Sequence, residues 1–146
     1  MMSKKPKVVH IITRLEPGGS SRNTIDSCLA QTTFYEVTLI HGPHPSGAGL
    51  INLLPSEVKR IEIPELQREL NPAKDLAAWR RLKTELAAIK PDIIHTHTSK
   101  AGALGRLAAA AYNKDAPVKA AVIHTPHGHL LYGYYGPFRT LAFRLI

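Results

Sequence analysis

Cysteine is nearly absent from this sequence: Cys28 is the only one among 146 residues. One thiol excludes an internal disulfide, and a protein without disulfides suits a reducing compartment, so we expect a cytoplasmic protein. Cys28 also falls within a predicted helix, and no Gly-x-Ser-x-Gly elbow occurs, so nucleophilic catalysis has little support.

Long apolar runs are absent too. No run approaches the roughly 18 apolar residues that cross a bilayer. Lys4, Lys5 and Lys7 make the N-terminus basic, but the apolar stretch that follows is too short for a secretory signal. Any membrane contact is therefore expected to be peripheral, at the inner face of the membrane.

The sequence lacks the common nucleotide-binding motifs. It contains no Walker A motif, and Gly102 and Gly105 fall inside a predicted helix, which excludes the dinucleotide fingerprint. Nineteen Lys and Arg against eleven Asp and Glu give a formal charge of +8, which favours anionic partners. The positive charge is dispersed and no recognition helix is evident, so we expect phosphorylated small molecules and no nucleic acid.

Strand-like and helix-like segments alternate along the whole chain. β-Branched or apolar runs predict strands, and apolar residues at three- and four-residue steps predict helices. The predicted strands are 7–13, 35–40, 58–63, 92–96 and 118–124, and the predicted helices are 21–31, 72–90, 98–112 and 138–146. This alternation predicts an α/β fold with a doubly wound parallel sheet in a single domain, 1–146. The last segment has no helix-stop signal, which suggests a truncated domain.

Histidines gather at the predicted strand ends. His10 lies mid-strand and is expected to be a packed core residue. Because ligands bind beyond the carboxyl ends of parallel strands, the other seven are expected to converge on one edge of the sheet. They are His41, His44, His95, His97, His124, His127 and His129.

Three loops bring further binding groups to that edge. Gly18, Gly19 and Ser20 begin one helix, where backbone amides can approach a phosphate or sugar, although a tight turn is an equal interpretation. Ser99 and Lys100 follow Thr98 at the start of another helix, and Lys100 is either a phosphate ligand or a solvated lysine.

Two pairs of histidines have a spacing that allows metal binding. The His95-Thr-His97 and His127-Gly-His129 spacings can chelate zinc. Carboxylates are scarce nearby, and Asp92 lies at the wrong end of its strand, so no metal or other cofactor is predicted.

Four segments together resemble a known family. They read VVHIITRLEPGGS (8–20), YEVTLIHGP (35–43), PDIIHTHTSKAGALGR (91–106) and HTPHGH (124–129). In this order and spacing the chain resembles the N-terminal domain of retaining family 4 glycosyltransferases of GT-B architecture, most of all bacterial enzymes that build capsule, exopolysaccharide or lipid-linked glycans.

The resemblance implies a Rossmann-like domain that is one half of a GT-B enzyme. It implies that the N-terminal half binds a glycan or lipid-linked acceptor, while a C-terminal domain, absent from this chain, binds the nucleotide-sugar donor. Gly18 and Gly19 would approach the donor diphosphate, and His127 would lie near the transferred sugar as the catalytic histidine. His97, Ser99 and Lys100 would line the acceptor side, with Ser20 and His129 as further binding residues.

Two other functions remain open from the residues themselves. One is a binding module that recognises a sugar or phosphate without turnover, and the other is a metal-dependent hydrolase that uses the edge histidines. Because half a cleft cannot align donor and acceptor, the chain alone is expected to fold but not to catalyse transfer.

Overall fold

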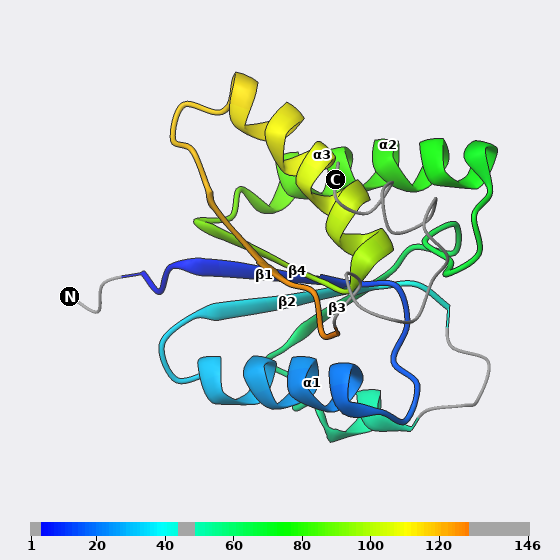
Figure 1. Ribbon diagram of the computed structural model, residues 1–146. Helices are drawn as coiled ribbons and strands as arrows, with labels where there is room; N and C mark the ends of the chain where they lie inside the picture. The colour runs from blue at the N-terminus through cyan, green and yellow to red at the C-terminus, as the bar shows by residue number, and fades with distance from the viewer. Residues whose placement is uncertain (1–3, 44–48, 129–146) are drawn as a thin grey trace.

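The fold is one parallel sheet with helices on both faces, as the computed structural model of residues 4–43 and 49–128 shows (Figure 1). The five strands are ordered β3-β2-β1-β4-β5, and every neighbouring pair is parallel. The strands are β1 (Lys7–Ile12), β2 (Glu36–His41), β3 (Lys59–Glu62), β4 (Ile93–His97) and β5 (Ala121–Thr125). The helices are α1 (Gly19–Gln31), the 3-10 helix η1 (Leu50–Leu53), α2 (Pro72–Ile89) and α3 (Ser99–Asp115). The predicted single-domain α/β fold is confirmed.

The strand β1 divides the hydrophobic core in two, because successive side chains of a strand point to opposite faces. Val8 and Ile12 pack with α1 and η1, on what we call the α1 face of the sheet. Val9 and Ile11 pack with α2 and α3 on the opposite α2/α3 face. This strand is buried on both faces, as its continuous β-branched sequence predicts.

The strand order reverses at β1. The chain adds β2 and β3 on one side of β1 and then crosses over to add β4 and β5 on the other. Right-handed crossovers in opposite directions place their helices on opposite faces, which is why α1 lies below the sheet in Figure 1 and α2 and α3 lie above it. At the carboxyl edge, the loop that follows β1 therefore runs toward one face of the sheet and the loop that follows β4 runs toward the other. Such folds bind ligands between these two loops.

The helix α2 follows the predicted pattern. Asn71 caps its start by accepting a hydrogen bond from the backbone N–H of Lys74, and Pro72 occupies the first turn. Leu82 and Leu86 are fully buried on its inner side. The helix ends at Lys90, whose left-handed backbone (φ 54°) is common at a helix C-terminus.

The end of the fourth strand differs from the sequence prediction. The strand β4 continues one residue further than predicted, to His97, which pairs with Thr125, so His97 as well as His95 lies within the strand. The cap residues of α1 and α3, Gly18 and Thr98, make no side-chain cap bond. The predicted helix 138–146 lies outside the described residues.

Substitution of Gly42 tests how tightly the end of β2 packs. A Cβ atom there would lie 1.8 Å from the backbone oxygen of Leu66 and 2.2 Å from that of Thr13. We expect Gly42→Ala to lower the free energy of unfolding by about 2 kcal/mol or more, since the backbone has to move. Chemical denaturation measures this. Gly128→Ala is the control, because a Cβ at Gly128 meets nothing within 4 Å; equal stability of the two variants would contradict the packing described.

Candidate functional site

Three loops meet at the carboxyl edge of neighbouring strands. Gly18 and Gly19 follow β1, Ser99 and Lys100 follow β4, and His127 follows β5. Since β1, β4 and β5 are adjacent in the sheet, the loops share one side of the molecule. His129 lies outside the described residues.

The start of α1 is open. A Cβ atom on Gly19 would meet nothing within 4 Å, and one on Gly18 would only touch the Glu16 carbonyl at 4.0 Å. Packing among residues 4–43 and 49–128 therefore does not require glycine at either position. Ser20 lies in the first turn, and the first amides of the helix have no side-chain cap. Such amides can bind an anion that approaches from outside.

The start of α3 holds a strained residue. Thr98 has a left-handed backbone (φ 64°), which is rare for a β-branched side chain. Its N–H donates to the Thr125 carbonyl at 3.1 Å, which ties the turn to β5. Its hydroxyl oxygen is buried and has no hydrogen-bond partner among the residues that the structure describes. Strain of this kind is concentrated at functional sites.

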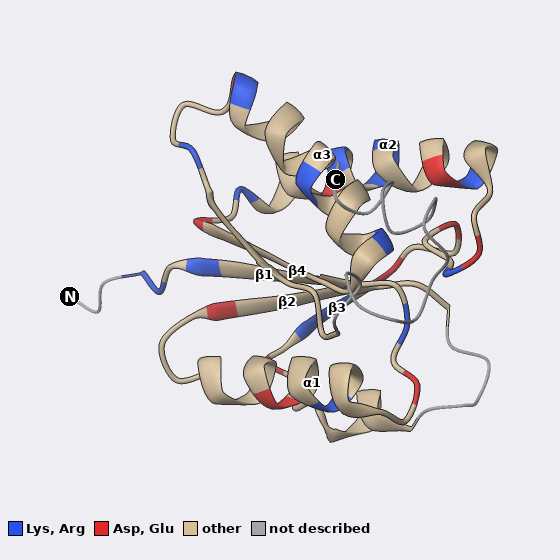
Figure 2. Ribbon diagram, in the orientation of Figure 1, with Lys and Arg blue, Asp and Glu red and all other residues tan. Residues whose placement is uncertain are grey.

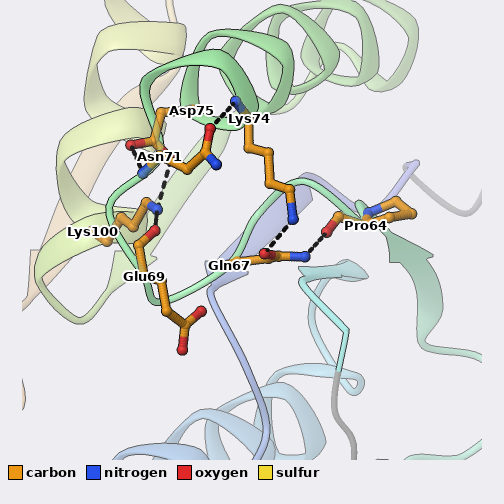
Figure 3. A network of polar contacts seen from close by, with 7 residues as sticks. All are labelled: Pro64, Gln67, Glu69, Asn71, Lys74, Asp75 and Lys100. Atoms are coloured by element: carbon orange, nitrogen blue, oxygen red, sulfur yellow. Dashed lines mark hydrogen bonds and ion pairs between the residues drawn. The ribbon is translucent and has the colours of Figure 1, made fainter.

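Lys100 is held by neighbouring acceptors. Its ammonium lies 2.6 Å from the Asp75 carboxylate and also donates to the backbone oxygen of Glu69 (Figure 3). The side chain is only 12% exposed. This contact joins the start of α2 to the start of α3, and in the present arrangement it neutralises the charge of Lys100. A role for Lys100 as a phosphate ligand stays a prediction.

Four histidines form what we call the histidine cluster: His10, His95, His97 and His127. His10 and His95 are register partners on β1 and β4, and their rings lie 5.1 Å apart. His97 stacks on His10 at 5.2 Å and on His127 at 5.1 Å. His10 and His97 are fully buried. Two strands and the loop after β5 thus bring imidazoles together on the α1 face.

Hydrogen bonds run through the cluster from α1 to the edge. Gln31 Oε1 lies 2.8 Å from His10 Nε2, and His10 Nδ1 lies 2.9 Å from His97 Nε2. His97 Nδ1 lies 2.9 Å from His127 Nε2. His95 bonds separately, with its Nε2 2.8 Å from the Thr125 hydroxyl.

The cluster is electrically neutral at physiological pH. Burial lowers the pKa of His10 to about 4, and burial together with the neighbouring histidines lowers the pKa of His97 to about 2. Burial is also the main cause that lowers the pKa of His95 and of His127. No carboxylate is among the causes that shift these four pKa values. The hydrogen bond of His10 with Gln31 favours the charged form of His10, but burial outweighs it.

Not every histidine joins the cluster, which corrects the expectation of one converging set. His41 is buried at the end of β2 and donates from Nδ1 to the Gly42 carbonyl at 2.8 Å. His124 lies on the α2/α3 face, where its Nδ1 is 3.0 Å from the Thr96 hydroxyl and α3 packs on it at Gly102. The alternation of side chains along a strand separates it from the cluster.

The metal interpretation rests on three of these residues. Ligand atoms of His10, His95 and His97 all lie within 4.8 Å of one another. Two imidazole nitrogens on one tetrahedral zinc ion would be about 3.3 Å apart, given Zn–N bonds near 2.0–2.1 Å. The 2.9 Å between His10 and His97 is shorter than this and matches a hydrogen bond. The geometry therefore favours a hydrogen-bonded chain over a chelate.

Sequence reasoning missed two members of this arrangement. His10 is buried as predicted, but its contact with His97 was not foreseen, and Gln31 was not considered at all. The signal available was strand order: if β1 neighbours β4, His10 faces the His95 and His97 side of that strand. Cys28 is fully buried, and burial raises its pKa to about 12, so its thiol is unreactive.

The sheet topology defines a Rossmann-like domain. Folds of this class bind ligands at the point where the strand order reverses. The sequence comparison is more specific. Residues 17–146 match the sequence profile described as Glycosyltransferase Family 4. The match covers most of the chain, and the chain belongs to this family. The resemblance predicted from the four segments is thereby confirmed, while GT-B architecture and retention stay predictions.

One curated relative is similar over part of its length. A stretch of 79 residues is 39% identical to the UDP-Gal:alpha-D-GlcNAc-diphosphoundecaprenol alpha-1,3-galactosyltransferase of Escherichia coli. The stretch covers 54% of this chain but only 19% of that enzyme. Within residues 4–43 and 49–128, no helix is long and apolar enough to span a membrane.

The neutral cluster predicts loss of stability in mild acid. An unfolded histidine has a pKa near 6.5, so below this pH the unfolded chain binds protons that the buried imidazoles of His10 and His97 do not. The free energy of unfolding should therefore fall as pH drops below about 6.5, by up to about 1.4 kcal/mol per pH unit for each buried histidine.

Denaturant titrations between about pH 7.5 and pH 5 measure this dependence. His10→Asn is the matched variant, because it removes one buried imidazole and should reduce the slope by up to about 1.4 kcal/mol per pH unit. A stability that is constant over this range would show that the cluster is not buried and neutral.

Proposed function

We propose that this chain forms the acceptor-side half of a glycosyltransferase that moves a sugar from a nucleotide-sugar donor to a glycan or lipid-linked acceptor with retention. The observation that carries the proposal is the carboxyl edge of a family 4 chain, where an uncapped helix start, with free space at Gly19 among the described residues, and His127 both follow strands of the same sheet. The relative's name supports a uridine diphosphate donor and a diphospholipid acceptor.

The edge suits the chemistry of sugar transfer. The leaving diphosphate carries negative charge that has to be stabilised while the acceptor hydroxyl attacks. The first amides of α1 supply partial positive charge without a metal ion, and Gly18 and Gly19 let the backbone approach closely. His127, as a neutral imidazole, can hydrogen-bond a hydroxyl of the sugar or acceptor.

The charge of the chain fits an anionic substrate. The formal charge of +8 favours anionic partners in general. Lys and Arg occur on β1, β3, α1, α2 and α3 and are not gathered on one face, which argues against a nucleic-acid groove (Figure 2). A lipid-linked acceptor would place the enzyme in the cytoplasm, in peripheral contact with the inner face of the membrane.

The direct test uses the complete gene product that carries this chain. Labelled UDP-sugars are supplied with a GlcNAc-diphospholipid acceptor, and the anomeric configuration of the product is read by NMR. We expect transfer to the lipid with the donor's configuration kept. No transfer from any nucleotide sugar would overturn the proposal, and an inverted product would overturn retention. The 146-residue chain alone should fold but show no turnover, because half a cleft cannot align the substrates.

Gly19 offers a substitution that separates folding from function. Gly19→Val places a side chain where none of the described residues contacts it, so the free energy of unfolding should change by less than about 1 kcal/mol. In the complete enzyme the same side chain should obstruct the diphosphate and raise the donor KM about tenfold or more.

Val118→Leu is the control, since Val118 is exposed and precedes β5, at the end of the sheet opposite the carboxyl edge. Unchanged donor KM in Gly19→Val would remove the α1 loop from the proposed site.

A further inference from the structure

A continuous path of hydrogen bonds links the surface helix α1 to the carboxyl edge. It begins at the side chain of Gln31, the last residue of α1, and passes through the buried rings of His10 and His97 to His127. Each link is 2.8 or 2.9 Å long. Every ring uses one nitrogen toward each neighbour, so the path has no branch at these three rings among the described residues.

Donor and acceptor roles along such a path are not independent. A neutral imidazole has one N–H donor and one bare nitrogen acceptor. If Nε2 of His10 donates to Gln31 Oε1, then Nδ1 of His10 has no proton and has to accept from His97 Nε2. The same rule at His97 makes its Nδ1 accept from Nε2 of His127. Whether Gln31 accepts or donates therefore determines the tautomer of all three rings.

We propose that Gln31, His10 and His97 act as a tautomer relay that holds His127 with its proton on Nε2 and its Nδ1 bare. With Gln31 oriented so that its Oε1 faces His10, as in the structure, the amide accepts the first hydrogen bond and so sets the direction. Gln31, His10 and His97 are in this respect positioning residues for His127.

The relay orients protons and does not conduct them. A conducting path would need a proton acceptor at its inner end, and the neutral amide of Gln31 is far too weak a base to serve. Burial and the absence of any carboxylate among the causes that shift these pKa values keep the rings uncharged. The consequence is a fixed hydrogen-bond acceptor at the edge, suited to a ligand hydroxyl and unsuited to a bare phosphate oxygen.

At the proposed site, Nδ1 of His127 would select a ligand hydroxyl over a phosphate oxygen. This selectivity rests on the proposed function. His127 Nδ1 is the one ring nitrogen of the path with no hydrogen bond among the described residues. His127 has a left-handed backbone (φ 56°), a local strain that the surrounding structure has to hold in place. A sugar or acceptor hydroxyl would donate to Nδ1, while the diphosphate would bind the α1 amides.

The relay is tested by reversing its direction at Gln31. In Gln31→Lys the ammonium can only donate, so His10 Nε2 has to accept and all three rings have to move their proton to Nδ1. Gln31→Glu keeps an acceptor at the same place and should keep the original tautomers. Ala30→Lys is the matched control, because Ala30 is exposed and receives the same charge one residue away.

Selective ¹⁵N-histidine labelling with long-range ¹H–¹⁵N correlation spectra reads the tautomers, because protonated and bare ring nitrogens have well-separated shifts. We expect Nε2–H at all three histidines in the wild type, Gln31→Glu and Ala30→Lys, and Nδ1–H at all three in Gln31→Lys. A His127 tautomer that does not respond to Gln31→Lys would overturn the relay. So would one tightly bound zinc ion per purified chain, because a chelate uses the lone pairs that the relay needs.

Activity of the complete enzyme separates the relay from the proposed function. Gln31→Lys should lower kcat of sugar transfer at least tenfold, and Ala30→Lys should leave it unchanged. An inverted tautomer with unchanged kcat would overturn the positioning role of the relay, even if transfer itself is shown. A wild type that shows the relay but transfers no sugar would overturn the proposed function and leave the tautomer relay standing.

Discussion

The parallel register of β1 against β4 is the constraint on which the site depends. It places His10 beside His95 and, diagonally, against His97, with their side chains on one face of the sheet. In the buried interior a charged imidazole is costly, so the rings remain neutral and satisfy one another by hydrogen bonds. A sheet with a different neighbour for β1 would leave Nδ1 of His10 and Nε2 of His97 without the hydrogen bond that they share.

On the α2/α3 face, α3 packs closely against the sheet. Gly102 and Gly105 let α3 lie directly on β4 and β5, because a Cβ at either position would come within 2.3 Å of His124 or 2.6 Å of Thr96. This close approach fixes where α3 begins, and with it the strained Thr98 and the contact of Lys100 with Asp75. The edge is therefore positioned from both faces of the sheet, while the start of α1 stays open.

The sequence predicted the architecture well and the chemistry only in part. Alternating β-branched and amphipathic segments were enough for five strands, three long helices and the edge at which Gly19, Lys100 and His127 lie, because these depend on local periodicity. The partners of the histidines depend on the order of the strands in the sheet and on which face each side chain points to. Neither can be read from a local sequence pattern. Hence His10 was placed in the core without its link to His97, and His124 was grouped with rings from which the sheet separates it.

Lys100 shows the same limit. The position of Lys100 after a strand and at the start of a helix predicts a phosphate ligand. The structure shows in addition that Lys100 contacts the Asp75 carboxylate on α2 and the Glu69 carbonyl in the loop before α2. The family assignment came instead from several segments in a fixed order, each weak alone. The order of several motifs is enough to predict the family. The environment of a single side chain can be described only from the folded structure.

We propose that the carboxyl edge, at which neutral His127 and the start of α1 both lie, holds the reacting sugar. A crystal structure of the complete enzyme with a nucleotide sugar and an acceptor analogue tests it most directly. The account predicts the diphosphate against the amides that follow Gly18 and a hydroxyl within hydrogen-bond distance of His127 Nδ1. A ligand bound on another face, or a phosphate oxygen on His127, would contradict it.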